Sequence, residues 1–339
     1  MKNPSSLPDI FLSFFMFTTD MKPNDTEYRK LVVSHIKALQ EFGYTGFEFP
    51  IKPTFPDNND FVQDIQSYIE FRGYLNSEKL DNIKIATNVG ATRTYDPTSP
   101  FPEQREKALA YLKSRVDITA HLYGNIMMGP IIVPYGGYFT DDFGTPIWSD
   151  ALQDLLAERY RTAQPVLNEL GKYAEAKGVK LAIEPITHWE QPGPNKLSQL
   201  IEFLDGVESK QVGVVIDGAH ETLDGDGPEI FKEQVAHIAE QGRLHYIQVS
   251  PPDRGALHTS WFPWQSFLAP VLQHYDGPIA VEIFNAIPDF LNSMRLTRRK
   301  FWIPGEDAGN SYPNAYDIAD KAIQVTQQEV TKILEHSTC

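Results

Sequence analysis

The chain has 339 residues, and its 45 acidic and 30 basic side chains give it a formal net charge of −15. Proteins that bind nucleic acid or an anionic membrane surface carry clustered Lys and Arg, so this charge argues against both partners. The one cysteine is Cys339, which excludes internal disulfides, cysteine-based zinc sites and, in practice, a cysteine nucleophile. The longest apolar run near the N-terminus, residues 10–17, is far shorter than the ~20 residues that span a bilayer, and no signal-peptide pattern is present. We therefore expect a cytoplasmic protein.

Short apolar segments alternate with longer amphipathic segments from one end of the chain to the other, which is typical of strands that alternate with helices. Strands are expected at Ile10–Phe17, Gly46–Phe49, Ile83–Val89, Asn125–Gly129, Val179–Glu184, Val212–Asp217, Leu244–Val249 and Ile279–Phe284. Helices are expected at Glu27–Phe42, Asn59–Tyr74, Pro102–Leu122, Asp150–Lys177, Lys196–Val207, Pro228–Glu240, Pro263–His274 and Tyr316–Leu334.

Eight strands with intervening helices indicate a parallel α/β fold, either a closed barrel or a doubly wound sheet. The sequence has no Gly-x-Gly-x-x-Gly after its first strand and no Walker-type Gly-Lys-Ser/Thr, which disfavours the nucleotide-binding sheet. We predict a (β/α)8 TIM barrel that forms a single domain over residues 1–339, with the barrel at about 8–300 and a C-terminal helical extension at about 301–339.

Four of the later strands finish on a polar side chain, namely Glu184, Asp217, Gln248 and Glu282. Side chains alternate between the two faces of a strand, so an inward Glu184 implies that Ala182 also faces the barrel axis while Leu181 and Ile183 face the helices. The same alternation sends the large aliphatic residues of the other three strands outward. All four polar groups are then expected at the carboxyl end of the barrel, where barrel enzymes build their sites.

Three carboxylates that converge at one point repel each other, so either a cation is bound or some of them are protonated. Oxygen ligands suit Mn²⁺, Mg²⁺ or Co²⁺ better than zinc. The alternative is that these acids cap helices or form salt bridges, and their equivalent positions on four strands favour a site. On the seventh strand His245 has the opposite parity to Gln248, so we expect it to be structural. His258, in the following loop, is a reserve candidate for the metal site.

Further polar and aromatic side chains follow the same strands. Glu190, His220 and Arg254 lie three to six residues beyond the strand ends, in loops on the expected active face. Phe15, Trp189, Trp261 and Trp264 are candidates either for the wall of a sugar pocket or for core packing. The basic cluster Arg295, Arg298, Arg299 and Lys300 is compatible with a phosphorylated sugar, although a solvated or subunit-contact role is favoured.

These spacings resemble the sugar isomerase/epimerase superfamily of xylose-isomerase-like barrels, and within it the ketose 3-epimerases of the tagatose, psicose and ribulose type. The shared pattern consists of Glu-Pro with a second Glu six residues on (Glu184, Glu190), Asp-x-x-His (Asp217, His220), a seventh-strand residue with Arg six residues on (Gln248, Arg254) and Val-Glu (Glu282). The segment GYTGFEF at 43–49 resembles the second strand of that family. The chain departs from the pattern at Gln248, where the family usually has histidine, and at ALHTSWF after Asp253-Arg254-Gly255.

The resemblance implies roles for these residues. It implies that Glu184, Asp217, Gln248 and Glu282 hold one divalent metal ion (Mn²⁺, Co²⁺ or Mg²⁺), and that Glu184 and Glu282 also exchange the proton. Glu190, His220 and Arg254 would bind the substrate.

The expected function is that of a metal-dependent sugar epimerase or isomerase, which transfers a proton at C3 of a ketose through an enediolate. An aldose–ketose isomerase or a keto-polyol dehydratase on the same site, and a non-catalytic sugar-binding relic, are the alternatives. AP endonucleases use the same barrel, but the charge of −15 and the oxygen-rich ligand set oppose a DNA substrate. The expected partner is a small sugar, and a homo-oligomer is left open.

Overall fold

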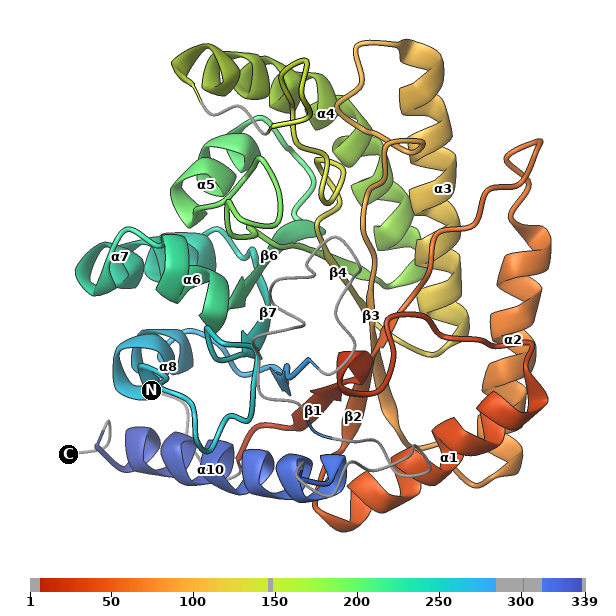
Figure 1. The fold of residues 1–339 in the computed structure, drawn as a ribbon, viewed down its shortest axis with the longest axis vertical. Coiled ribbons are helices and arrows are strands. Elements are labelled where there is room, and N and C mark those ends of the chain that lie inside the picture. Colours follow the sequence, from red (N-terminus) through yellow and green to blue (C-terminus); the bar gives the residue numbers. More distant parts are fainter. Residues whose placement is uncertain (1–6, 146–148, 285–300, 302–312, 337–339) are drawn as a thin grey trace.

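The computed structural model describes residues 7–145, 149–284, 301 and 313–336. Its strands pair in parallel, in the order of the sequence, and β1 also pairs with β8, which closes the barrel (Figure 1). The strands are β1 (Ile10–Ser13), β2 (Gly46–Pro50), β3 (Lys84–Asn88), β4 (Ile126–Gly129), β5 (Lys180–Ile183), β6 (Val212–Asp217), β7 (Leu244–Val249) and β8 (Ile279–Val281). The predicted TIM barrel is therefore confirmed.

Helices surround the barrel as the sequence pattern predicts (Figure 1). They are α1 (Thr26–Glu41), α2 (Val62–Ser77), α3 (Pro102–His121), α4 (Asp150–Lys177), α5 (Leu197–Asp205), α6 (Gly218–Asp224), α7 (Pro228–Glu240), α8 (Trp264–Leu272) and α10 (Ala315–His336). Gly178 ends α4 in the left-handed conformation, at φ 70°, which glycine adopts without steric cost and which allows β5 to start two residues later.

The structure differs from the predicted elements in several places. Strand β8 ends at Val281 rather than at Phe284, and α2 covers Val62–Ser77 rather than Asn59–Tyr74. The first predicted strand stops at Ser13, whose side chain caps the short 3₁₀ helix η1 (Phe14–Met16) by accepting a hydrogen bond from Phe15 N. Helix α6 was not predicted, because its seven residues are too few to show a helical period. The side chain of Asp217, the last residue of β6, starts α6 by accepting a hydrogen bond from His220 N at 2.9 Å. His220 therefore lies in a helix rather than in a loop.

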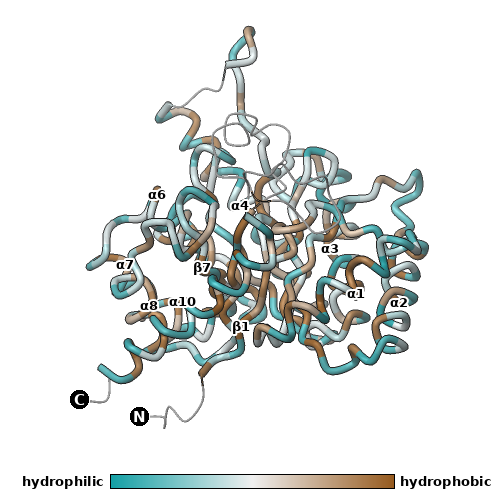
Figure 2. Tube along the Cα trace, turned by 60° about the horizontal axis from the view of Figure 1, so that its bottom comes forward, coloured by the Kyte–Doolittle hydropathy of each residue, from teal (hydrophilic) through white to brown (hydrophobic). Residues whose placement is uncertain are grey.

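The apolar residues form two separate clusters, one on each side of the sheet. The outer cluster joins the strands to the helices and includes Leu181 and Ile183. The inner cluster fills the barrel and consists of Phe11, Ala86, Ile126, Met128, Ala182, Val215, Tyr246 and Ala280. Hydrophobic segments accordingly lie in the interior, whereas the outer helices alternate between hydrophilic and hydrophobic turns (Figure 2). The predicted alternation along the strands is confirmed, and the inner cluster forms an apolar floor under the carboxyl ends of the strands.

The C-terminal helix α10 belongs to the outer ring, where it packs against α1, α8 and β8 (Figure 1). The Tyr44 hydroxyl donates a hydrogen bond to Ala319 O at 2.8 Å, and His35 Nδ1 lies 2.8 Å from the Tyr316 hydroxyl. The predicted C-terminal extension is thus the element that covers the seam between the first and the last strand. The division into a single domain stays a prediction.

The basic cluster Arg295, Arg298, Arg299 and Lys300 lies outside the described residues. Among the helices of the described part of the chain, none combines the length and the apolar character that crossing a membrane requires.

Candidate functional site

The four predicted strand-end residues all lie buried at the carboxyl end of the barrel. Glu184 and Glu282 directly follow β5 and β8, Asp217 ends β6, and Gln248 lies near the end of β7. Backbone hydrogen bonds fix the two glutamates, because Glu184 N donates to Gly129 O at 3.1 Å and Glu282 N donates to Val249 O at 3.0 Å. The inward orientation predicted for these side chains is confirmed by their mutual contacts, which are described next.

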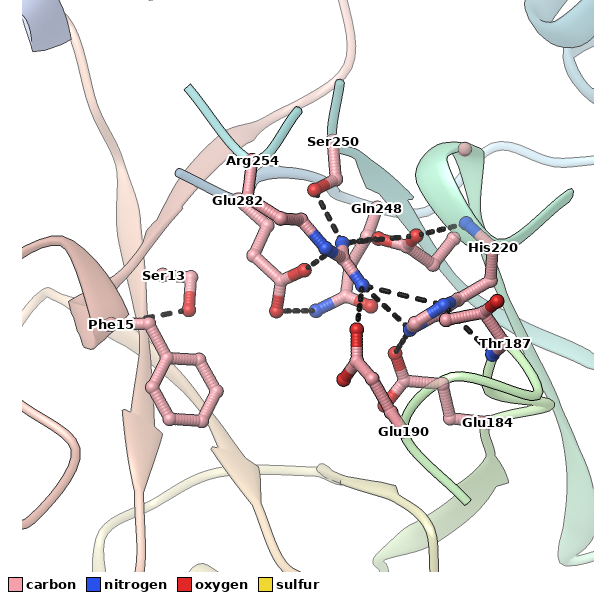
Figure 3. A network of polar contacts seen from close by, with 12 residues as sticks. Ser13, Phe15, Glu184, Thr187, Glu190, His220, Gln248, Ser250, Arg254 and Glu282 are labelled. Atoms are coloured by element: carbon pink, nitrogen blue, oxygen red, sulfur yellow. Dashed lines mark hydrogen bonds and ion pairs between the residues drawn. The ribbon is translucent and has the colours of Figure 1, made fainter. Parts of the chain in front are cut away.

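Arg254 is the cation at the centre of this cluster. Its Nη1 lies 3.2 and 3.3 Å from the two carboxylate oxygens of Asp217 and 2.9 Å from Glu282 Oε2, and it donates to Ser250 Oγ at 2.6 Å. Figure 3 shows the guanidinium reaching between Glu282 and the side of the cluster that carries His220. The residue has a left-handed φ of 53°, which is uncommon for a residue with a Cβ atom, and its carbonyl oxygen accepts a hydrogen bond from Phe284 N.

His220 connects α6 to the loop after β5. Thr187 N donates to His220 Nδ1 at 3.0 Å, so the proton of the neutral imidazole lies on Nε2, which is 3.3 Å from Glu184 Oε1. Burial, together with the charge of Arg254, holds the pKa of His220 well below its usual value and keeps the ring neutral. Arg254 Nη2 is 2.7 Å from the same Nε2, and two donors do not attract each other. The guanidinium is therefore held by its carboxylate partners rather than by His220.

Glu190 lies beside Arg254 on the open side of the cluster, as Figure 3 shows. Its Oε1 is 3.7 Å from Arg254 Nη2, and its Oε2 accepts a hydrogen bond from the Tyr135 hydroxyl. A cavity of about 400 Å³ opens here, and its lining includes Glu184, Glu190, His220, Arg254 and Glu282. Three of the apolar lining residues are Phe15, Ile186 and Phe284, and the rings of Phe15 and Phe284 stack at 4.8 Å. The site therefore combines a polar end with an apolar wall.

Gln248 lies below the guanidinium and is fully buried. Its Nε2 is 3.1 Å from Glu282 Oε1, and 3.2 and 3.1 Å from the two oxygens of Glu48, a buried residue of β2. Its Oε1 is buried and has no hydrogen-bond partner in the described part of the chain. The amide thus directs its donors to carboxylates and leaves its carbonyl oxygen available to a ligand.

Burial governs the protonation of the site. Desolvation and the charge of Asp217 raise the pKa of Glu184 well above its ordinary value, against the effect of Arg254. Desolvation also raises the pKa of Glu282, although the adjacent Arg254 opposes this shift. Burial alone would lower the pKa of Arg254, but Asp217, Glu282 and Glu190 together raise it, so the guanidinium stays charged. These side chains are buried, and burial strengthens each of these interactions.

The residues present match a divalent cation in the type of donor they offer, although among the described residues no three acidic, histidine or cysteine side chains are grouped so that they could hold an ion. Three carboxylates and an amide oxygen without a partner form the kind of oxygen donor set that Mn²⁺, Mg²⁺ and Co²⁺ accept. The guanidinium of Arg254 contacts two of these carboxylates, so it competes with any metal ion for the same charge.

The structure assembles the predicted site residues, but sequence reasoning missed several of their partners: Glu48, Tyr135, Thr187 and Ser250. It also missed Ser13 and Asn88, which donate hydrogen bonds to Glu48. Glu48 carried a signal, since the outward-facing Phe47 and Phe49 on either side of it in GFEF place it inside the barrel. The loop residues carried none.

Other candidates lie elsewhere. Trp189 and Trp261 are 59% and 75% exposed, Trp264 starts α8, and none of the three is among the described residues that line the cavity. His245 is structural, as expected, and its Nε2 lies 3.1 Å from Lys210 O. His258 is half-buried in the loop before α8 and takes no part in the contacts given above, so its role as a reserve ligand stays a prediction.

Comparison with known proteins decides the family. The model of the xylose isomerase-like TIM barrel family matches residues 36–300. The chain belongs to that family. An L-ribulose 3-epimerase of Methylomonas sp. is 24% identical over 253 residues, which cover 73% of this chain and 78% of that protein. A "probable ketose 3-epimerase" of Synechocystis sp. is 27% identical over 122 residues, 35% of this chain and 41% of the other.

Solved structures agree with this assignment. A protein of Anabaena variabilis named "putative sugar phosphate isomerase/epimerase" is 69% identical, with a TM-score of 0.93 over 97% of this chain and 100% of that one. D-allulose 3-epimerase from Methylomonas sp., solved with D-allulose, shares the fold at 21% identity and a TM-score of 0.71, over 95% and 97% of the two chains. The predicted resemblance to the ketose 3-epimerases is confirmed.

Proposed function

We propose that this protein is a ketose 3-epimerase, in which Glu184 and Glu282 exchange a proton with C3 of the sugar. The observation that carries the proposal is that two buried glutamates from strands separated by β6 and β7 line one cavity, and both have a raised pKa. A carboxyl group with a raised pKa can both take up and release a proton near neutral pH. Inversion at C3 needs a base on one face of the carbon atom and an acid on the other, and the two strand ends offer both.

The remaining polar groups of the cavity suit a sugar. Glu190, His220 and Arg254 offer an acceptor, a neutral imidazole and a cation on one side, and Phe15 stacked on Phe284 offers an apolar face. A volume of about 400 Å³ lies within the range of small-ligand sites, which is roughly 300–1,000 Å³. The relatives named L-ribulose 3-epimerase and D-allulose 3-epimerase support a ketose as the substrate.

We further propose that one divalent metal ion is held by Glu184, Asp217, Gln248 and Glu282. The chemistry that such an ion supplies is polarisation of the ketose carbonyl and stabilisation of the enediolate. Arg254 would then turn toward Glu190 and the substrate, because its present partners would be shared with the metal. Glu190, bonded to Tyr135, would receive it.

The test is a screen of free ketoses and ketose phosphates in the presence of Mn²⁺, with C3 epimers detected by chromatography. The same assay separates the alternatives, because an isomerase would yield an aldose and a dehydratase would release water. A sugar-binding relic would bind a ketose without exchanging its C3 hydrogen in D₂O. A chain that yields no C3 epimer and no exchange from any ketose would refute the proposal.

The roles of the two glutamates have a sharper test. Glu184→Gln and Glu282→Gln keep the shape of the side chain and one coordinating oxygen, but each removes a proton acceptor, so turnover should fall by ~100-fold or more. Each variant retains one base and should therefore exchange deuterium into only one C3 epimer. The epimer that exchanges in Glu184→Gln should differ from the one that exchanges in Glu282→Gln. Asp117→Asn on the outer helix α3 changes the charge equally and serves as the control. Full epimerisation by either glutamine variant would assign the proton transfer to other residues.

A further inference from the structure

Glu48 is a fully buried carboxylate that the proposed chemistry does not use. It is fixed from both neighbouring strands, since Ser13 Oγ on β1 donates to its Oε1 at 3.0 Å and Asn88 Nδ2 on β3 donates to the same atom at 3.4 Å. Glu48 is not among the described residues that line the cavity. It faces Gln248 instead.

The contacts of Gln248 determine which way its amide points. The group that faces Glu48 lies 3.2 and 3.1 Å from the two Glu48 oxygens and 3.1 Å from Glu282 Oε1. An ionised carboxylate can only accept, so an NH₂ group faces Glu48 when Glu48 is ionised. If the amide were flipped, its carbonyl oxygen would face the two oxygens of the ionised Glu48 in a buried site, and repulsion disfavours that arrangement. The carbonyl oxygen must therefore point away from Glu48.

We propose that Glu48 is a positioning residue, which orients the Gln248 amide so that its carbonyl oxygen faces the cation-binding centre. The proposal rests on the metal site of the proposed function. Glu282 also accepts from the amide, but Arg254 holds the other oxygen of Glu282, whereas Glu48 offers both of its oxygens to Gln248. Carboxylates that hold a metal ligand in this way typically change metal affinity by about 10–100-fold when they are replaced.

One experiment tests the pairing without a metal. Gln248→Glu removes the donors and places a new carboxylate against Glu48 and Glu282, so at pH 8 in EDTA the melting temperature should fall by roughly 5–15 °C. Adding Glu48→Gln restores a donor to the pair, and most of this loss should be recovered. If the double variant melts at the temperature that the two single shifts predict by addition, Glu48 and Gln248 are not coupled and the proposal is wrong.

A second experiment tests the consequence for the metal, with Mn²⁺ affinity measured by calorimetry in the absence of sugar. Glu48→Gln should weaken Mn²⁺ binding by about 10–100-fold. Gln248→Leu should weaken Mn²⁺ binding as well. When Glu48→Gln is added to the Gln248→Leu variant, the Mn²⁺ affinity should not fall further. Asp117→Asn is the control for the change of charge. Independent, additive losses would show that Glu48 does not act through Gln248, and would overturn the proposal.

The two experiments separate this proposal from the proposed function. If the wild-type protein binds no Mn²⁺, the metal site in the proposed function is wrong. The melting experiment would then decide alone: recovery in the double variant supports the positioning role of Glu48, and failure to recover overturns it.

Discussion

Replacing Arg254 with methionine removes the guanidinium that lies between Asp217 and Glu282 but keeps an unbranched side chain. Nη1 is 2.9–3.3 Å from three carboxylate oxygens, and the residue is only 4% exposed, so water shields the remaining charges poorly. Removing one partner of a buried ion pair costs about 3–5 kcal/mol. At ~2–4 °C per kcal/mol for chains of 150–250 residues, and less for longer chains, Tm should fall by roughly 5–15 °C in EDTA.

Mn²⁺ should reverse this loss, because the metal no longer competes with the guanidinium for Asp217 and Glu282. We expect a saturating concentration of Mn²⁺ to raise the Tm of Arg254→Met by more than it raises the Tm of the wild type. The control is Arg115→Met, which removes a buried guanidinium from Asp64, a partner that is 16% exposed. Neither residue lines the cavity, so the variant should lower Tm without changing the response to Mn²⁺.

The melting curves can refute this reasoning in two ways. If the EDTA-treated variant melts at the wild-type temperature, the guanidinium does not neutralise the two carboxylates. If Mn²⁺ stabilises the variant less than the wild type, Arg254 assists the metal instead of competing with it.

The remaining predictions concern the metal ligands, acid stability and the barrel floor. Gln248→His should keep or tighten Mn²⁺ binding, and Gln248→Leu should weaken it, as measured by calorimetry. If Mn²⁺ affinity is unchanged in Gln248→Leu but falls in His258→Ala, His258 is the ligand. Burial lowers the pKa of His35 from 6.5 to about 4, so between these pH values the unfolded chain binds a proton that the folded chain does not, and stability falls on acidification. His35→Phe should reduce the loss between pH 6.5 and 5, measured by urea unfolding, by ~1–2 kcal/mol. Met128→Ala in the inner cluster should cost about 2–5 kcal/mol in the same assay, whereas Phe143→Ala, at a side chain that is 93% exposed, should cost little.

The strand-end residues could be predicted because a strand has a strict period of two. Once Glu184 was assumed to face the axis, the neighbouring Leu181 and Ile183 had to face the helices, and the two apolar clusters agree. The same rule applied to GFEF places Glu48 inside the barrel, between the outward-facing Phe47 and Phe49.

Other features could not be read from the sequence. The position of Arg254 depends on a left-handed backbone conformation and on a loop that returns it to Asp217, and neither has a periodic signal. Helix α6 was missed because seven residues are too few to show a helical period, although helix capping had been stated as the alternative role for acids such as Asp217, and the structure shows that Asp217 caps α6. A single carboxylate can serve as a helix cap and as a site residue at once, and residue type alone does not separate the two roles.

The place of α10 in the ring has a consequence for how the protein is made. The seam of the barrel joins β1 to β8. Helix α1 contacts α10 through His35 and Tyr316, and Tyr44, between α1 and β2, donates a hydrogen bond to Ala319 O. During synthesis the first strand and helix emerge from the ribosome long before their partners, so the barrel cannot close until nearly the whole chain has been released. Contacts that span almost the full sequence slow folding and leave strand edges exposed in the meantime. A premature stop codon shortly before α10 would leave α1, α8 and β8 uncovered in every copy of the nascent protein.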